Sequence, residues 1–550
     1  MNLMQDKWIT VQRKKGEIEK IAPSQITDGV NSDNPIIEIV TPRPDFQGAL
    51  YQFLIGLFQT VYAPKDENEW EDKFNSPPNP EELKKETDKI AFAFDLFGEK
   101  VRFMQDISLD SDANTANISA LLIESPGENT IKENKDFFTK RGSVEKICNH
   151  CAASALFTLQ TNSPSGGQGH LTSIRGGGPI TTILKFNSTK KEDQELHTLW
   201  SDIWINVLPK DCFSQEPKKE KNYENVFPWI TNKYYKQNSK GSKTTINDLN
   251  PLSVYWSYPR RIQLQQSKEN IHCDVCNIES DISVKSYLVK GYGLDYGGGS
   301  WIHPLSPYYF TKDKELGETW LPFHPQPGGI IYNQWMSFVY GKKDKDKNAK
   351  VLSYYFENRK FPEEQTRVWA FGFDMDNMKA RNWYESLIPI YSIDPKFIDK
   401  YESEISKILQ AATQVANNLQ TKVKDAWFNQ DQKPKGDFDY LKISFFKATE
   451  TKFYNLAKTI RDNLGKEFPF NNEAKEEWLK YLNEESLKVF ELYVESGSVE
   501  FENLKRIVEA RKSLISWNLG DKIRNDFGLP IKDKPAAKKK ANNNIGAIKK

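Results

Sequence analysis

The sequence predicts an α+β protein in which a large mixed N-terminal domain with a four-cysteine metal site is followed by a C-terminal four-helix bundle. Three observations lead to this prediction. Residues 1–390 mix short β-like runs with helical segments and many Gly and Pro turns, and two Cys-x-x-Cys pairs lie among them. After residue 392 four amphipathic helical patterns follow one another with few β signals.

The mixed domain, predicted over residues 1–390, is expected to contain several short strands and at least one buried helix. Runs rich in β-branched and aromatic residues predict strands at Ile36–Val40, Ile180–Phe186 and Val368–Phe373. The apolar stretch Leu50–Val61 predicts a buried helix.

The bundle is predicted over residues 391–528, because apolar residues recur there mostly at steps of three and four. Breaks at Lys433–Gly436, Gly465–Phe470 and Ser496–Ser498 separate the helices. We interpret the stripes as core positions. They are Ile405, Ile408, Ala412, Val415, Leu419, Val423 and Trp427; Leu441, Phe445, Ala448, Phe453, Leu456 and Ile460; Trp478, Leu482, Val489, Leu492 and Tyr493; and Phe501, Leu504, Val508, Arg511 and Ile515.

Residues 529–550 are predicted to form a basic, disordered tail. The net charge of the chain is +1, but the positive charge is concentrated in this tail. Residues 530–550 hold seven Lys and one Asp, so the rest of the chain carries about five net negative charges. A weakly acidic body cannot bind a duplex over its whole surface, so any nucleic-acid binding must use local patches or partners.

Composition excludes several classes of protein. With 550 residues, 14 Trp and 32 Phe, the chain is expected to fold into more than one domain and not to be disordered as a whole. We expect no signal peptide and no membrane span, because no run approaches about 18 consecutive apolar residues. Few cysteines, spaced as metal ligands, are typical of a reducing cytoplasm.

The two cysteine pairs, Cys148 with Cys151 and Cys273 with Cys276, predict a structural zinc site. The two-residue gap lets both thiolates of a pair face one ion, and two such pairs complete a tetrahedral site with no open position for catalysis. A redox role for the pairs is the alternative, and His150 or His272 could each replace one cysteine as a ligand.

Catalytic motifs are missing from the sequence. It has no phosphate-binding G-x-x-x-x-G-K-[ST] motif, no H-E-x-x-H and no G-x-S-x-G. The chain has only six histidines, and His303 and His324 each precede a proline, which indicates rigid turns.

Three segments are candidates for nucleic-acid contact. Gly-rich Ser163–Thr182 could bring backbone amides to a phosphate or into a groove, or could be a mobile surface loop. The segment Gly291–Pro307 follows Lys285 and Lys290 and suits either a projecting finger or a plain β-hairpin. Phe371–Ser386 groups Asp, Asn, Lys and Arg side chains that could read bases, although an Asp could equally cap a helix there.

Taken together, these motifs resemble those of the large subunit (CasA type) of the type I-E CRISPR Cascade surveillance complex. The resemblance covers about residues 1–525 and rests on motifs that occur in the family's order. They are DKWI (Asp6–Ile9), APKD (Ala63–Asp66), FMQ (Phe103–Gln105), SPG (Ser125–Gly127), the first cysteine pair, RGGGPITT (Arg175–Thr182), the second pair, HPLSP (His303–Pro307) and FGFDMDNMKARNWYE from Phe371.

The resemblance implies a non-catalytic subunit of a ribonucleoprotein in antiviral defence. In this family a guide RNA reads the target by base pairing, and the large subunit reads the short flanking motif (PAM) on double-stranded DNA. It helps to open the duplex and to nucleate the R-loop, and it recruits a helicase-nuclease. The expected partners are the 5′ handle of the guide RNA, the backbone and small subunits, and target DNA, with no membrane.

The resemblance also implies site residues. The glycine loop matches Gly166, Gly167, Gln168 and Gly169, and the lysine finger is nearest to Lys290. The wedge that splits the first base pairs falls at Asp376, Asn377, Met378 and Lys379. Asn377 stands closest to the glutamine that the family places there. Contacts with guide RNA and neighbouring subunits fall on Leu122, Ile123 and Glu124.

Two other hypotheses remain open from the sequence. A zinc-containing enzyme that acts on nucleic acid would need an open metal position. A purely structural subunit of a ribonucleoprotein would need none of the DNA-reading residues.

Overall fold

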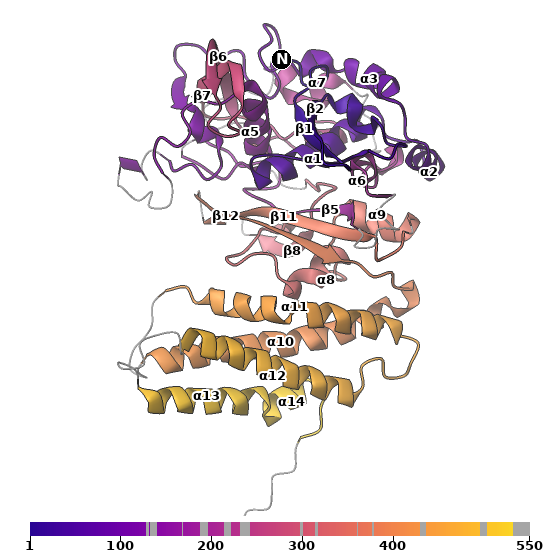
Figure 1. Ribbon diagram of the computed structural model, residues 1–550, viewed down its shortest axis with the longest axis vertical. Coiled ribbons are helices and arrows are strands. Elements are labelled where there is room, and N and C mark those ends of the chain that lie inside the picture. Colours follow the sequence, from indigo (N-terminus) through magenta and orange to yellow (C-terminus); the bar gives the residue numbers. More distant parts are fainter. Residues whose placement is uncertain are drawn as a thin grey trace, which may run out of the picture. The chain divides into compact units, whose positions relative to one another are not determined.

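A computed structural model describes residues 1–127, 131–132, 140–167, 169–187, 196–213, 222–231, 243–297, 301–313, 317–359, 361–376, 379–428, 436–494 and 503–531 (Figure 1). These form two compact units: Met1–Ile330 with Gln334–Ser392, and Ile331–Asn333 with the residues from Ile393 onward. The fold is mixed α+β, as the sequence predicts. None of the helices in the described ranges is long and apolar enough to cross a membrane. Most of the predicted tail, residues 532–550, lies outside the described residues.

The first unit contains four small antiparallel sheets of three strands each. Their strand orders are β2–β1–β3, β4–β7–β6, β10–β8–β9 and β12–β11–β5. The strands are β1 (Ile9–Arg13), β2 (Ile18–Ile21), β3 (Ile36–Ile39), β4 (Asn114–Asn117), β5 (Thr181–Phe186), β6 (Arg261–His272), β7 (Glu279–Lys290), β8 (Tyr308–Asp313), β9 (Gly317–Pro322), β10 (Asp346–Lys347), β11 (Thr366–Asp376) and β12 (Lys379–Pro389). The three predicted strands are confirmed as β3, β5 and the inner part of β11.

The described part of the first unit also contains eight α-helices. They are α1 (Pro44–Val61), α2 (Glu67–Asn75), α3 (Pro80–Asp88), α5 (Asn149–Asn162), α6 (Leu199–Trp204), α7 (Tyr223–Val226), α8 (Trp335–Val339) and α9 (Lys350–Asn358). Pro44 begins α1 with its fixed φ, and Asp45 adds a negative charge at the positive end of the helix dipole. The predicted buried helix is confirmed, because α1 is enclosed along nearly its whole length.

An aromatic cluster around Phe53 of α1 forms the core of the first unit. The Phe53 ring meets five others edge-on, with centroids 5.4–6.2 Å apart. They are Trp8, Phe94, Phe103, Phe157 and Trp256. Edge-to-face packing of this kind stabilises a core beyond the buried area alone, and Phe157 brings α5 into it.

The second unit consists of long helices that run alongside one another (Figure 1): α10 (Ile398–Trp427), α11 (Asp439–Asp462), α12 (Asn472–Val494), α13 (Leu504–Asn518) and short α14 (Asp521–Asp526). α10 packs against α11, α12 and α13. Its predicted stripe is buried from Ile405 through Val423.

The predicted core faces of the later helices need correction. On α13 the predicted positions Leu504 and Val508 are exposed, and Ile507, Ala510 and Leu514 are buried instead. Apolar residues occur on two adjacent faces of this helix, so periodicity alone did not decide which face packs. On α11 Ala448 is exposed and its neighbour Thr449 is buried, and on α12 Leu492 is exposed. The predicted Phe501 lies outside the described residues.

Gly48 allows α1 to approach the β11–β12 hairpin closely. A Cβ atom on Gly48 would lie 2.8 Å from Cε2 of Phe371 and 3.0 Å from Cη2 of Trp383. Both distances are too short for an alanine without movement of the two rings.

We therefore expect Gly48→Ala to destabilise the protein by about 1–3 kcal/mol, as overpacked cores do. Helix propensity alone would give the opposite sign, a gain of about 0.5–1 kcal/mol. Urea unfolding followed by near-UV circular dichroism measures the change. Gly465→Ala is the control, because nothing lies within 4 Å of the added atom; equal effects of the two changes would contradict the packing argument.

Candidate metal centre and nucleic-acid interface

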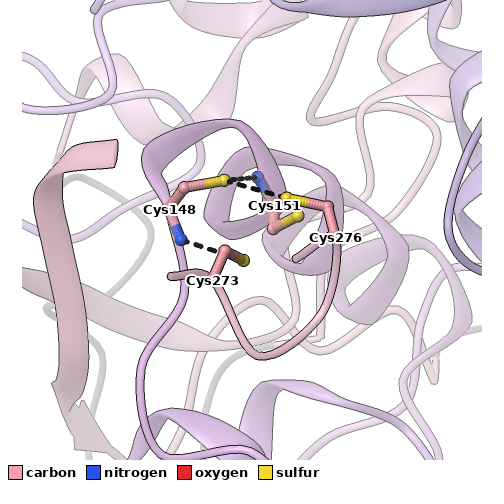
Figure 2. A group of neighbouring side chains, drawn as sticks. All are labelled: Cys148, Cys151, Cys273 and Cys276. Atoms are coloured by element: carbon pink, nitrogen blue, oxygen red, sulfur yellow. Dashed lines mark hydrogen bonds between the residues drawn. The ribbon is translucent and has the colours of Figure 1, made fainter. Parts of the chain in front are cut away.

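The four cysteines of the two pairs meet at one point in the first unit (Figure 2). Cys148 and Cys151 lie at the start of α5, and Cys273 and Cys276 lie in the turn between β6 and β7. All four sulfur atoms are within 4.8 Å of one another, and the Sγ atoms of Cys148 and Cys276 are 3.8 Å apart. Four sulfurs around a tetrahedral ion at 2.3 Å would be about 3.8 Å apart, so the donor set fits a metal ion.

Backbone contacts hold the two pairs together. The amide of Cys148 donates to Sγ of Cys273 at 3.3 Å, and the amide of Cys151 donates to Sγ of Cys148 at 3.4 Å. The carboxylate of Asp274 accepts from the amides of Glu145 and Lys146 at 2.8 and 2.9 Å. The turn of the second pair is therefore attached to the segment that leads into the first.

The four thiols also lie close enough to influence one another's protonation. Hydrogen bonds with Cys148 and Cys151 lower the pKa of the Cys276 thiol to about 7, whereas hydrogen bonds with Cys148 and Cys273 raise the pKa of the Cys151 thiol. Four thiolates at these distances repel one another, and a divalent ion removes that repulsion. Cys148, Cys151 and Cys273 are buried, which leaves little access for a substrate.

The alternatives from the sequence are less well supported by this geometry. Neither His150 nor His272 belongs to the cysteine group. His150 faces Lys20, with Nδ1 and Nζ 2.7 Å apart, and His272 lies 3.3 Å from a carboxylate oxygen of Glu279. A redox dithiol would not need the second pair beside it, so the convergence of both pairs favours metal binding.

The glycine-rich segment begins at the far end of α5, and Lys290 is the last residue of β7. α5 has 14 residues, a length of about 21 Å, and Ser163 follows directly after it. Val284 of β7 pairs with Ile147 beside the cysteines. From Val284 to Lys290 the strand extends about 20 Å at 3.3 Å per residue. The far ends of α5 and β7 therefore lie at similar distances, about 20 Å, from the bridge between Ile147 and Val284.

At that far end the glycine loop contacts the turn after Lys290. The amide of Tyr292 donates to the carbonyl of Gly169 at 2.8 Å. Gly169 has φ +81°, and a Cβ atom there would lie 3.0 Å from Cα of Gly291. Glycine is needed at this position for both reasons. Gly167, by contrast, has open space around it, and Lys290 is exposed.

The other end of the glycine-rich segment contacts β11. Gly178 has φ +63°, and a Cβ atom there would lie 2.6 Å from the carbonyl oxygen of Phe373 and 2.9 Å from Cε of Met375. The segment therefore extends from the Lys290 turn to the strand that ends at Asp376. Three segments that are far apart in the sequence thus form one continuous region.

The segment Phe371–Ser386 forms the β11–β12 hairpin, so the alternative that one of its Asp residues caps a helix is wrong. Asp376 pairs with Lys379 at the end of the ladder. Near that end Arg381 donates to both carboxylate oxygens of buried Asp374, at 2.6 and 3.1 Å. This ion pair lies beside a bulge at Met375, so it fixes the twist of the hairpin end.

Some candidate contact residues have side chains that are buried or already paired within the protein, and others lie outside the described residues. The side chains of Leu122 and Ile123 are buried. Glu124 accepts two hydrogen bonds of 2.7 Å from Arg43, just before α1. Gln168, Asn377 and Met378 lie outside the described residues.

Sequence reasoning missed two charged residues that support this region, Asp274 and Arg260. Their partners are far away in the chain, and only Asp274, which lies inside the Cys-x-x-Cys turn, carried a local signal. Asp374 and Arg381 were among the residues singled out from the sequence, but not the ion pair between them.

Comparisons with known proteins agree on one family. Residues 2–489 match the family model of the CRISPR-associated protein Cse1. The fold is similar to that of CasA from Thermus thermophilus, with 16% identity, a TM-score of 0.63 and coverage of 94% of this chain and 99% of that one.

Two further solved structures are similar. Cse1 from Thermobifida fusca has 13% identity and a TM-score of 0.64, with 96% of this chain and 98% of that chain covered. A chain of a structure described as a CRISPR RNA-guided surveillance complex has 13% identity and a TM-score of 0.65, with 94% and 99% covered. At such identities the likeness shows a shared fold.

We expect the purified protein to carry close to one divalent metal ion per chain, measured by elemental analysis. Because metal binding here is coupled to folding, Cys276→Ser should abolish the bound ion. It should also lower the melting temperature by roughly 3–4 °C if the ion contributes about 3 kcal/mol, because a unit of this size has a large entropy of unfolding. Cys212→Ser, outside the cluster, is the matched control. A wild-type protein prepared without chelators that contains no metal would contradict the assignment.

Proposed function

Because this chain belongs to the family of the CRISPR-associated protein Cse1, we propose that it is the large, non-catalytic DNA-recognition subunit of an RNA-guided Cascade complex of type I-E. In this role it recognises the PAM on double-stranded DNA, helps to open the duplex and nucleate the R-loop, and recruits a helicase-nuclease in the cytoplasm.

One observation carries the proposal: the glycine-rich segment connects the Lys290 turn to the end of β11. Gly169 contacts the residues after Lys290, and Gly178 contacts the strand that ends at Asp376. A reader of duplex DNA needs a slender backbone that can enter a groove, a cation for phosphates and a protruding element that separates base pairs. The three segments offer these properties side by side.

The proposed contacts would recognise a short DNA motif with low sequence specificity. Backbone amides and a single lysine can contact the minor groove, where A·T and G·C pairs are distinguished only coarsely. A wedge at Asp376, Asn377, Met378 and Lys379 would cost a few kcal/mol of unstacking, which pairing with the guide RNA offsets.

The proposed RNA contact at Leu122, Ile123 and Glu124 would use the backbone more than the side chains. Leu122 and Ile123 face the core, and Glu124 is held by Arg43. Those contacts anchor the loop, so its amides and carbonyls present a fixed surface to the 5′ handle of the guide RNA and to neighbouring subunits.

The four cysteines are proposed to hold a structural zinc ion. Four thiolates favour zinc, and a closed four-thiolate site leaves no coordination position for water. The site would supply rigidity, consistent with the proposal that the subunit is not an enzyme.

The helices α10 to α13 are proposed to form a four-helix bundle that contacts the small subunits and the displaced strand. Lys447 is exposed on α11, whereas Lys452 forms an ion pair with Glu477 at 2.7 Å. Of these two, Lys447 is the better candidate for a phosphate contact.

Gly167→Asp tests whether DNA approaches the glycine loop. The position is open and exposed, so an aspartate adds a charge without strain. We expect the reconstituted complex to bind a PAM-containing duplex about 10-fold more weakly, because the carboxylate repels phosphates.

Gly167→Ala is the matched control and should stay within about two-fold of the wild type. Binding is measured by electrophoretic mobility at fixed salt, with permuted flanking trinucleotides. Equal affinities of the Asp and Ala variants, or no flank preference in the wild type, would argue against DNA recognition at this loop.

Arg381→Gln tests the role of the hairpin in opening the duplex. Loss of the ion pair leaves buried Asp374 without its cation and loosens the hairpin end. We expect affinity for intact duplex to fall about 10-fold, which equals about 1.4 kcal/mol, and affinity for a pre-opened bubble to be unchanged.

Arg511→Gln is the control, because Arg511 is as exposed as Arg381 but pairs with a partly exposed carboxylate, Glu491, in the second unit. The same loss of affinity for the intact duplex and the bubble would contradict a role in strand opening.

A further inference from the structure

The glycine loop has no strong cation of its own. Between Ser163 and Ile174 the chain contains neither Lys nor Arg. His170 is exposed, but partial desolvation of its ring and the nearby charge of Arg260 lower its pKa, which favours the neutral form. An element that binds a polyanion needs positive potential nearby. Exposed Lys290, in the turn that contacts Gly169, is one source of that potential, and cationic residues packed against the loop are a second.

Arg260, immediately before β6, packs against the loop. Its side chain is only 7% exposed, and its Nη2 donates to the carbonyl of Pro164. Its backbone is fixed from both sides by Gln160 near the end of α5: the amide of Arg260 donates to Oε1 at 3.0 Å, and its carbonyl accepts from Nε2 at 2.9 Å. The guanidinium is thus held firmly against the first residues of the loop.

The charge of Arg260 is not neutralised within the described residues. Its Nε and Nη1 atoms are buried without a hydrogen-bond partner there. Neighbouring Arg261 provides the contrast, because its Nε lies 2.7 Å from a carboxylate oxygen of Asp106. Burial lowers the pKa of Arg260 to about 10, so it stays charged at neutral pH. A buried, unpaired charge is costly.

Arg175, toward the other end of the glycine-rich segment, repeats this pattern. It is fully buried and donates only to neutral groups: Gln52 at 2.6 Å, and Thr181 and Ser306 at 2.9 Å each. Burial lowers its pKa to about 10 as well. No carboxylate among the described residues forms an ion pair with either arginine, so the segment lies on two uncompensated positive charges.

We infer that Arg260 is the positioning residue that gives the glycine loop its affinity for a phosphodiester group of a nucleic-acid backbone. The guanidinium fixes the loop through Pro164 and attracts the phosphate across a region of low dielectric, where a charge acts more strongly than in water. A phosphate on the loop supplies the missing counter-charge. The inference rests on the proposed function, since it names the residue that charges the same site.

The test is the salt dependence of duplex binding by the reconstituted complex. Each neutralised phosphate contributes about −0.9 to the slope of log K against log [salt]. We expect Arg260→Gln, which keeps a donor for the Pro164 carbonyl, to weaken binding about 10-fold at 0.1 M salt and to reduce the slope by about 0.9. Arg260→Lys should keep the wild-type slope. Lys268→Gln, which removes an exposed charge from the same strand, should change neither quantity.

A second measurement does not depend on how a variant folds. With the wild-type complex, neutral methylphosphonates replace single phosphates in the flanking base pairs. We expect one position to weaken binding about 10-fold and to lower the slope by about 0.9. In the complex with Arg260→Lys, a methylphosphonate at the same position should still weaken binding.

The outcomes separate the two proposals. An unchanged slope for Arg260→Gln, or no sensitive phosphate, would overturn the inference while leaving flank recognition intact; a purely structural Arg260 would lower the melting temperature without changing the slope. Loss of any flank preference in the wild-type complex would overturn the proposed function and the inference with it.

Discussion

The convergence of four thiols at the start of α5 is the constraint on which the candidate interface depends. Cys148 and Cys151 join this helix to the β6–β7 turn that carries Cys273 and Cys276. From the bridge between Ile147, beside Cys148, and Val284, the helix and the rest of β7 extend about equally far, roughly 20 Å. A junction at one end therefore bears on which residues meet at the other, and an ion held by the four thiols would act on the loop from a distance.

Glycine provides the second constraint, because the loop touches its neighbours through backbone atoms. Gly169 and Gly178 both have positive φ and leave no room for a side chain. Gly167 is open instead, so it faces solvent where a ligand can approach. The same residue type thus has a packing role at two positions and an exposed role at the third, and only the surrounding atoms distinguish them.

The proposed anion site would arise from local electrostatics, because the chain as a whole is nearly neutral. The net charge of +1 gives little long-range attraction. Among the described residues, no carboxylate forms an ion pair with buried Arg260 or Arg175, in contrast to Arg261 and Arg381, which pair with Asp106 and Asp374. Because these two buried arginines have no carboxylate partner among the described residues, positive potential is concentrated beneath the glycine-rich segment. The unpaired charges lower the stability of the protein.

The sequence by itself determined the local features: the thiol ligands from the spacing of Cys148 and Cys151, the α10 core face from its period, and the family from ordered motifs. Tertiary structure decided the rest. It selected Ile507 rather than Leu504 for the core of α13, and it buried Leu122. Within the described residues it also left Arg260 without a carboxylate partner. A local pattern records propensity and spacing, whereas burial and charge pairing depend on which other segments the fold brings alongside, some of them more than a hundred residues away.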